Sequence, residues 1–102
     1  MNNKQTIQFA SSSLVSRASA AKQRAQLQQV FSAAGDLALL DFSKVDSISS
    51  SYADELFGVL VQVYGLERLT QKIEITNASQ DVFYAIAEAI HYRVAMPSKV
   101  AC

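Results

Sequence analysis

"LALLDFSKVDSISSSYADELFGVL", residues 37–60, holds the strand and the helix that decide the fold. Its first four residues form an apolar run that Asp41 follows, and a short apolar run bounded by turn residues is typical of a central strand covered on both faces. A helical stripe follows, with apolar residues at i, i+3, i+4, i+7 and i+11: Ala53, Leu56, Phe57, Leu60 and Tyr64. We therefore predict a central strand, a short turn and an amphipathic helix that ends at Gly65.

The sequence on both sides of this stretch continues the alternation of strands and helices. "QTIQF" (5–9) and "KIEIT" (72–76) alternate apolar and polar residues, as half-buried strands do. Ser11–Ser13 can start a helix over the next twenty residues, and a last helix is predicted over residues 80–94. Its buried stripe is predicted to contain Phe83, Ile86 or Ala87, Ile90 and Val94. This order predicts an α/β fold with a small, mostly parallel sheet covered by helices.

Length and composition limit the classes of protein that the chain can belong to. Its 102 residues, half of them apolar, suit one domain over residues 1–102 with a frayed tail from about residue 96. Nine basic residues balance nine acidic ones, so we expect no binding to nucleic acid or to a membrane surface. Cys102 has no second cysteine with which to form a disulfide or a zinc site. We expect a cytoplasmic protein without an export signal, a cofactor or a metal.

Four serines precede the second helix, at position 47 and at positions 49–51. We predict that Ser51 is the N-cap, with its hydroxyl accepting a hydrogen bond from the backbone N–H of Asp54. The carboxylates of Asp54 and Glu55 would then lie favourably near the positive end of the helix dipole. One serine is enough for a cap, so the others stay exposed at the carboxyl edge of the sheet, where parallel α/β folds place their sites.

The run "LLDFSKVDSISSSYADELFGVL" (39–60) resembles the central motif of STAS domains, the family of anti-sigma factor antagonists. It is more similar still to the STAS-like domains of unknown function, which share the aspartate-phenylalanine strand end and the alanine-aspartate-glutamate-leucine helix start. The resemblance extends more weakly through "SLVSRASA" (13–20), "IEITNAS" (73–79) and "AIAEAIHYRV" (85–94). It therefore covers most of the chain.

This resemblance implies a non-catalytic domain that binds an ATP-dependent serine kinase or an anti-sigma factor. In that family the kinase phosphorylates the first serine of a pair, which corresponds here to Ser50 with Ser51 beside it. Ser49 stands where the family has an aspartate. The implied surface spans residues 43–55, with Asp41 as a strand-end anchor. Its partner-binding candidates are Ser43, Lys44, Asp46, Ser49, Tyr52, Asp54 and Glu55.

Two other functions stay open at this stage. In the first, the chain is a structural or assembly subunit that self-associates, for example as a homodimer, through its second helix, where Val59, Val61 and Val63 widen the apolar surface. In the second, it is a magnesium-binding phospho-acceptor. The carboxylates that would converge on that ion are Asp41, Asp46, Asp54 and Glu55.

The remaining charged and titratable residues favour no enzyme. His91, the single histidine, is predicted to lie far from Ser50, because a helix in a parallel fold runs away from the carboxyl edge of the sheet. A Ser-His-Asp arrangement is therefore not expected. Arg17, Lys22 and Arg24 are predicted to form a solvated face of the first helix.

Overall fold

Three parallel strands form the main sheet of the protein. The computed structural model describes residues 4–32 and 36–95, and the predicted frayed tail from residue 96 lies outside them. The sheet order is β1-β3-β5, with Leu40 of the central strand beside Ile7 on one side and Ile75 on the other. The strands are β1 (Lys4–Gln8), β3 (Leu37–Asp41) and β5 (Ile73–Thr76). The predicted parallel α/β fold, with residues 37–41 in its centre, is confirmed.

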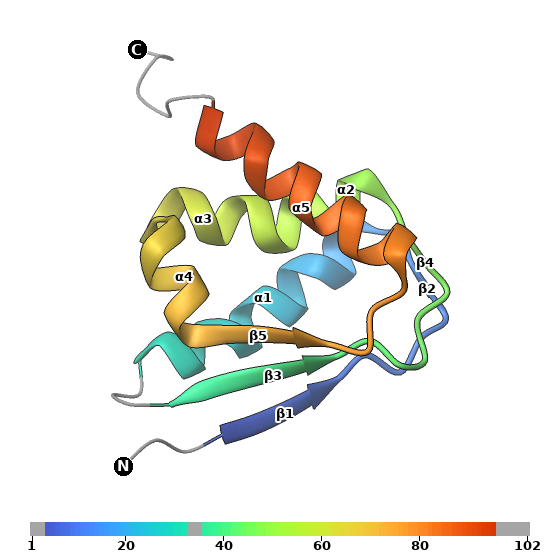
Figure 1. Ribbon diagram of the computed structural model, residues 1–102, viewed down its shortest axis with the longest axis horizontal. Coiled ribbons are helices and arrows are strands. Elements are labelled where there is room, and N and C mark those ends of the chain that lie inside the picture. The colour runs from blue at the N-terminus through green and yellow to red at the C-terminus, as the bar shows by residue number, and fades with distance from the viewer. Residues whose placement is uncertain (1–3, 33–35, 96–102) are drawn as a thin grey trace.

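The helices lie together on one face of this sheet (Figure 1). They are α1 (Arg17–Ser32), α2 (Ser50–Ala53), the π-helix η1 (Asp54–Gly58), α3 (Val59–Tyr64), α4 (Leu66–Lys72) and α5 (Gln80–Ala95). Ala38 and Leu40 of β3 point toward them and are fully buried, whereas Leu37 and Leu39 alternate with them and are half-buried. The prediction that this strand is covered on both faces is therefore wrong for the described chain.

A second, two-stranded sheet holds the loops at the carboxyl edge together. It pairs β2 (Ser13–Leu14) with β4 (Ser47–Ile48) in parallel. The prediction that Ser11–Ser13 start a helix is therefore wrong. Helix α1 begins after Ser16, whose hydroxyl accepts a hydrogen bond from the backbone N–H of Ser19 at 3.1 Å.

The second helix was predicted most closely. Helices α2, η1 and α3 form one continuous rod over residues 50–64, and its stripe is buried from Ala53 to Leu60. Tyr64 stacks on Phe31 with their ring centroids 4.3 Å apart. Gly65, at φ 89°, ends the rod in a conformation that favours glycine. Helix α4, which was not predicted from the sequence, follows at once.

Helix α5 spans residues 80–95, against a prediction of 80–94. Ile86 of its predicted stripe is buried, but Phe83 and Val94 are 55% and 51% exposed, so their predicted burial is wrong for the described chain. Across residues 4–32 and 36–95, no helix has the length and apolar character needed to cross a membrane.

Aromatic packing fixes the carboxyl edge of the sheet against the second helix. Phe9 and Phe42 follow the ends of β1 and β3, and their rings stack with centroids 4.4 Å apart. Phe42 also packs near Phe57 of η1, with the two ring centroids 6.4 Å apart. All three rings are buried. The loop that contains the serines therefore starts and ends on core residues.

Candidate functional site

Asp41 ends β3 and joins the ends of all three strands. Its carboxylate accepts hydrogen bonds from Asn77 Nδ2 at 3.0 Å, from the backbone N–H of Ser43 at 2.9 Å and from Gln8 Nε2 at 3.1 Å. The bond from Asn77 contributes most to lowering the pKa of Asp41, to about 2. Asn77 has φ 59°, a left-handed conformation that asparagine tolerates at a tight turn. Asp41 thus anchors both the serine loop and the turn into α5.

Ser49, and not Ser51, is the N-cap of the second helix. Its Oγ accepts a hydrogen bond from the backbone N–H of Tyr52 at 3.0 Å and donates one to the carbonyl of Val15 at 2.7 Å. The predicted cap lies two residues too late because the pairing of β4 with β2 continues to Ser49, whose N–H bonds the carbonyl of Leu14. Ser51 lies inside the first helical turn.

Asp54 and Glu55 open the π-helix and bind three arginines, a set that we call the arginine–carboxylate network. Arg93 of α5 binds Asp54 through Nε and Nη2, both at 2.8 Å. Arg17 of α1 reaches Asp54 at 3.1 Å and Glu55 at 3.0 Å, and Arg24 reaches Glu55 at 2.9 Å. The hydrogen bonds from Arg93 lower the pKa of Asp54, and those from Arg24 lower the pKa of Glu55. The network ties α1, η1 and α5 to one another.

Gly58 leaves the room that this network needs. A Cβ atom at this position would lie 2.6 Å from Asp54 Oδ1 and 2.9 Å from Arg93 Cγ. Arg24 also donates a short hydrogen bond to the backbone carbonyl of Glu55, at the start of the π-helical turn. Single π-helical turns within α-helices occur frequently at functional sites.

The arginine–carboxylate network contradicts two of the sequence-based predictions. Arg24 is not on a solvated face, since its side chain is 19% exposed and is engaged with Glu55. The carboxylates proposed for magnesium do not converge, because Asp41 bonds the strand ends while Asp54 bonds arginines. Within residues 4–32 and 36–95, no group of three or more His, Cys, Asp and Glu side chains is arranged to hold a metal ion.

A hollow of about 880 Å³ lies beside the network, between α5 and the start of the second helix. Ser50, Arg17, Asp54 and Arg93 line it together with His91. His91 was expected far from Ser50 on the premise that the last helix runs away from the serines, and this premise is wrong. Helix α5 does not run away from the serines but crosses over α2 (Figure 1).

The predicted partner-binding residues differ in exposure. Ser49, Asp54 and Glu55 are half-buried and engaged in the bonds described above, and Tyr52 is 2% exposed, so it cannot be a surface contact. Burial also raises the pKa of the Tyr52 hydroxyl. The exposed members of the segment, which we call the serine edge, are Ser43, Lys44, Asp46, Ser47 and Ser50.

Two residues of the site, Arg93 and Gly58, were not predicted from the sequence. An acidic pair at a helix start signals that some cation lies nearby, but it does not say which one. Arg93 is 39 residues from Asp54 along the chain, and the crossing of α5 over η1 brings them together. Of the three valines that widen the second helix, Val61 is buried, Val59 is half-buried and Val63 is 60% exposed.

The parallel sheet, the helices on one face and the helix that starts at the carboxyl edge after an aspartate define a small α/β domain of the STAS-like class. Residues 19–83 match the sequence model of the family described as STAS-like domain of unknown function, and the chain belongs to that family. No curated protein and no solved structure matches the chain. Arg24, Asp54 and Glu55 lie inside the matched segment, whereas Arg17 and Arg93 lie outside it.

Proposed function

We propose that this chain is a non-catalytic regulatory module that binds a protein partner through the serine edge and is switched by phosphorylation of Ser50. One observation carries the proposal. Ser50 is exposed at the first position of the second helix, and its hydroxyl makes no hydrogen bond to any residue in the described ranges. The resemblance to anti-sigma factor antagonists gives the class of partner, an ATP-dependent serine kinase or an anti-sigma factor.

The neighbouring serines are less available for modification. The hydroxyl of Ser49 is used twice, by Tyr52 and Val15, and Ser47 bonds Ser13 at 3.3 Å. Ser51 is half-buried inside the helical turn. Ser50 is therefore the best phosphate acceptor of the run, in agreement with its place in the family motif.

A phosphate on Ser50 would enter a charged environment. Ser50 shares its hollow with Arg17 and Arg93, the two arginines that Asp54 already binds. A phosphate dianion accepts charge-assisted hydrogen bonds from guanidinium groups, as a carboxylate does, and carries more negative charge, so it would compete with Asp54 for them. The partner would then meet both a new charge on the serine edge and a rearranged arginine–carboxylate network.

The test compares Ser50→Asp, Ser50→Ala and the wild-type chain in binding to a kinase-like ATPase or an anti-sigma factor from the same organism. We expect Ser50→Asp to weaken binding by at least about tenfold, as a charge inserted into an interface does, and Ser50→Ala to bind like the wild type. Tyr84→Asp is the matched control, because Tyr84 is 64% exposed on α5 and lies outside the serine edge. Circular dichroism checks that each variant is folded.

A second measurement addresses the phosphate itself. Incubation with the kinase and ATP, followed by peptide mass spectrometry, should locate the phosphate on Ser50, and Ser50→Ala should abolish it. Phosphate on another residue, or equal affinity of the wild type and Ser50→Asp for the partner, would contradict the proposal.

A further inference from the structure

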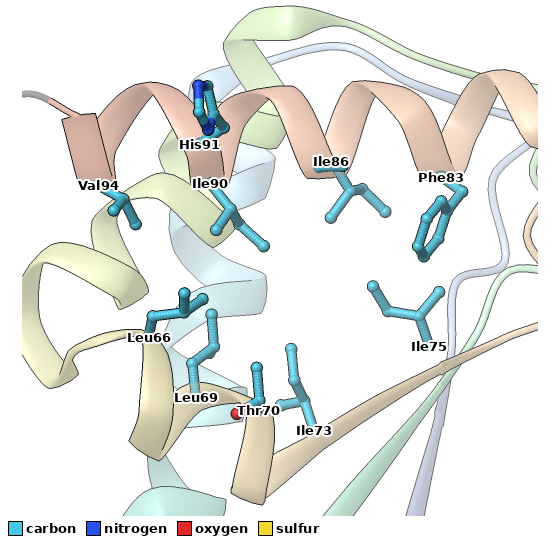
Figure 2. A pocket seen from close by; sticks show the side chains of 11 residues that line it. Leu66, Leu69, Thr70, Ile73, Ile75, Phe83, Ile86, Ile90, His91 and Val94 are labelled. Atoms are coloured by element: carbon cyan, nitrogen blue, oxygen red, sulfur yellow. The ribbon is translucent and has the colours of Figure 1, made fainter.

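An apolar hollow of about 420 Å³ opens between α4, β5 and α5 (Figure 2). Leu66, Ile73, Phe83 and Val94 point into it from the three elements. Among residues 4–32 and 36–95, no aspartate, glutamate, lysine or arginine lines it. His91 contributes to its rim but points away from the space between the elements. Whatever fills this hollow must therefore present an apolar surface.

Helix α5 brings more apolar surface to this hollow than the described chain covers. Its stripe over the hollow is set at helical spacing, yet Phe83 is 55% exposed and Val94 is 51% exposed at its two ends. Leu66 across the hollow is 44% exposed. A contiguous exposed apolar face of this kind marks an interaction surface in a water-soluble fold.

Strand β5 adds an unpaired sheet edge to the same surface. It pairs with β3 on one side, and no strand in the described part of the chain pairs with its other side. Ile73 and Ile75 of this edge also line the hollow. The free N–H and C=O groups of an edge strand form a template for pairing with another strand.

We propose that a second copy of this chain covers this surface, with the two β5 strands paired antiparallel about a twofold axis and the apolar faces of α4 and α5 meeting across it. The occupant must offer a strand edge beside an apolar face. The chain itself offers both, and a twofold interface brings the same patch of each copy together. The chain has no net charge, so no overall repulsion opposes the approach of two copies.

The size of the surface sets the strength of the expected dimer. Leu69 and Ile86, two of the eleven lining residues, are already buried. At the roughly 35 Å² that a residue contributes to a standard interface, the other nine cover about 300 Å² per copy, or about 600 Å² in all. Stable interfaces bury about 1,200–2,000 Å², so this dimer is weak and depends on protein concentration.

The test measures the oligomeric state of the full chain by sedimentation equilibrium from roughly 10 µM to roughly 1 mM. We expect a monomer–dimer equilibrium whose dissociation constant rises by at least about tenfold in Phe83→Glu, because a carboxylate would be buried at the interface. Tyr84→Glu is the matched control on the same helix, 64% exposed and outside the hollow. Val63→Glu changes a 60% exposed residue of α3 and tests association through the second helix instead. Both controls should dimerise like the wild type.

Hydrogen exchange gives an independent measurement of the strand pairing. The backbone amides of residues 73–76 should become more protected at the high concentration in the wild type, and not in Phe83→Glu. A monomer at every concentration would overturn the proposal, and so would a dimer that Val63→Glu weakens and Phe83→Glu does not. A chain shortened after residue 95 that dimerises when the full chain does not would show that residues 96–102 fill the hollow, which also overturns it.

Discussion

Asp41 shows how one side chain can hold three strand ends in place. Its carboxylate accepts hydrogen bonds from Asn77, from the N–H of Ser43 and from Gln8, and each bond favours the charged form. The aspartate after an apolar run was recognisable in the sequence. Its bonds to Asn77 and Gln8 were not recognisable, because these residues lie 36 and 33 positions away from Asp41 in the sequence.

The lowered pKa of Asp41 predicts a loss of stability in acid. The folded-state pKa is about 2 and the ordinary value is 3.8, so the unfolded chain binds more protons between these values. The stabilisation that Asp41 contributes is therefore complete above about pH 4 and is lost as the pH falls to about 2. We expect the difference in unfolding free energy between wild type and Asp41→Asn, measured with urea, to shrink over this range.

Two measurements test whether the charge of Asp41 causes this loss of stability in acid. An NMR titration of the Asp41 carboxyl should show a higher pKa in Asn77→Gly, which removes the strongest donor and keeps a residue that tolerates φ 59°. A difference between wild type and Asp41→Asn that is as large at pH 2 as at pH 7 would contradict the charge argument.

At the scale of elements, the second helix illustrates what periodicity can and cannot predict. Its buried stripe from Ala53 to Leu60 follows from the 3.6-residue period, and the structure confirms it. The position of its cap does not follow, because a two-residue ladder between β2 and β4 extends to Ser49. A ladder this short leaves no alternation to detect. The arginines that bind Asp54 and Glu55 come from two other helices, whose crossing depends on the tertiary fold.

Gly58 provides the sharpest test of how these helices meet. In an open helix, Gly→Ala stabilises by about 1 kcal/mol. At this position the new Cβ would lie 2.6 Å from Asp54 Oδ1 and 2.9 Å from Arg93 Cγ, so we expect Gly58→Ala to destabilise by about 1–3 kcal/mol in urea unfolding. Part of the cost should disappear in an Arg93→Ala background, with a coupling energy of at least about 1 kcal/mol. Equal costs in both backgrounds would mean that α5 does not limit the space at Gly58.

At the scale of the whole molecule, the sequence predicted the alternation of strands and helices and therefore the parallel sheet. It did not predict the path of the helices, which all lie on one face (Figure 1). A continuous apolar run such as residues 37–40 gives the same pattern whether both faces of a strand are covered within the chain or one face is left to water or to another molecule. Phe83 and Val94 of α5 are a second case, since the period marks this face of the helix as apolar but does not show whether the chain itself covers it.

Adjacent leucines of β3 test this one-sided arrangement directly. Leu40 points toward the helices and is fully buried, so Leu40→Ala should destabilise by about 2–5 kcal/mol through lost burial and a cavity. Leu39 points to the open face and is half-buried, so Leu39→Ala should cost about 1 kcal/mol or less. Both variants remove the same atoms from the same strand, and urea unfolding of dilute protein measures both. Because the two substitutions differ only in the face they affect, a Leu39→Ala cost as large as that of Leu40→Ala would mean that the open face of the sheet is covered in solution.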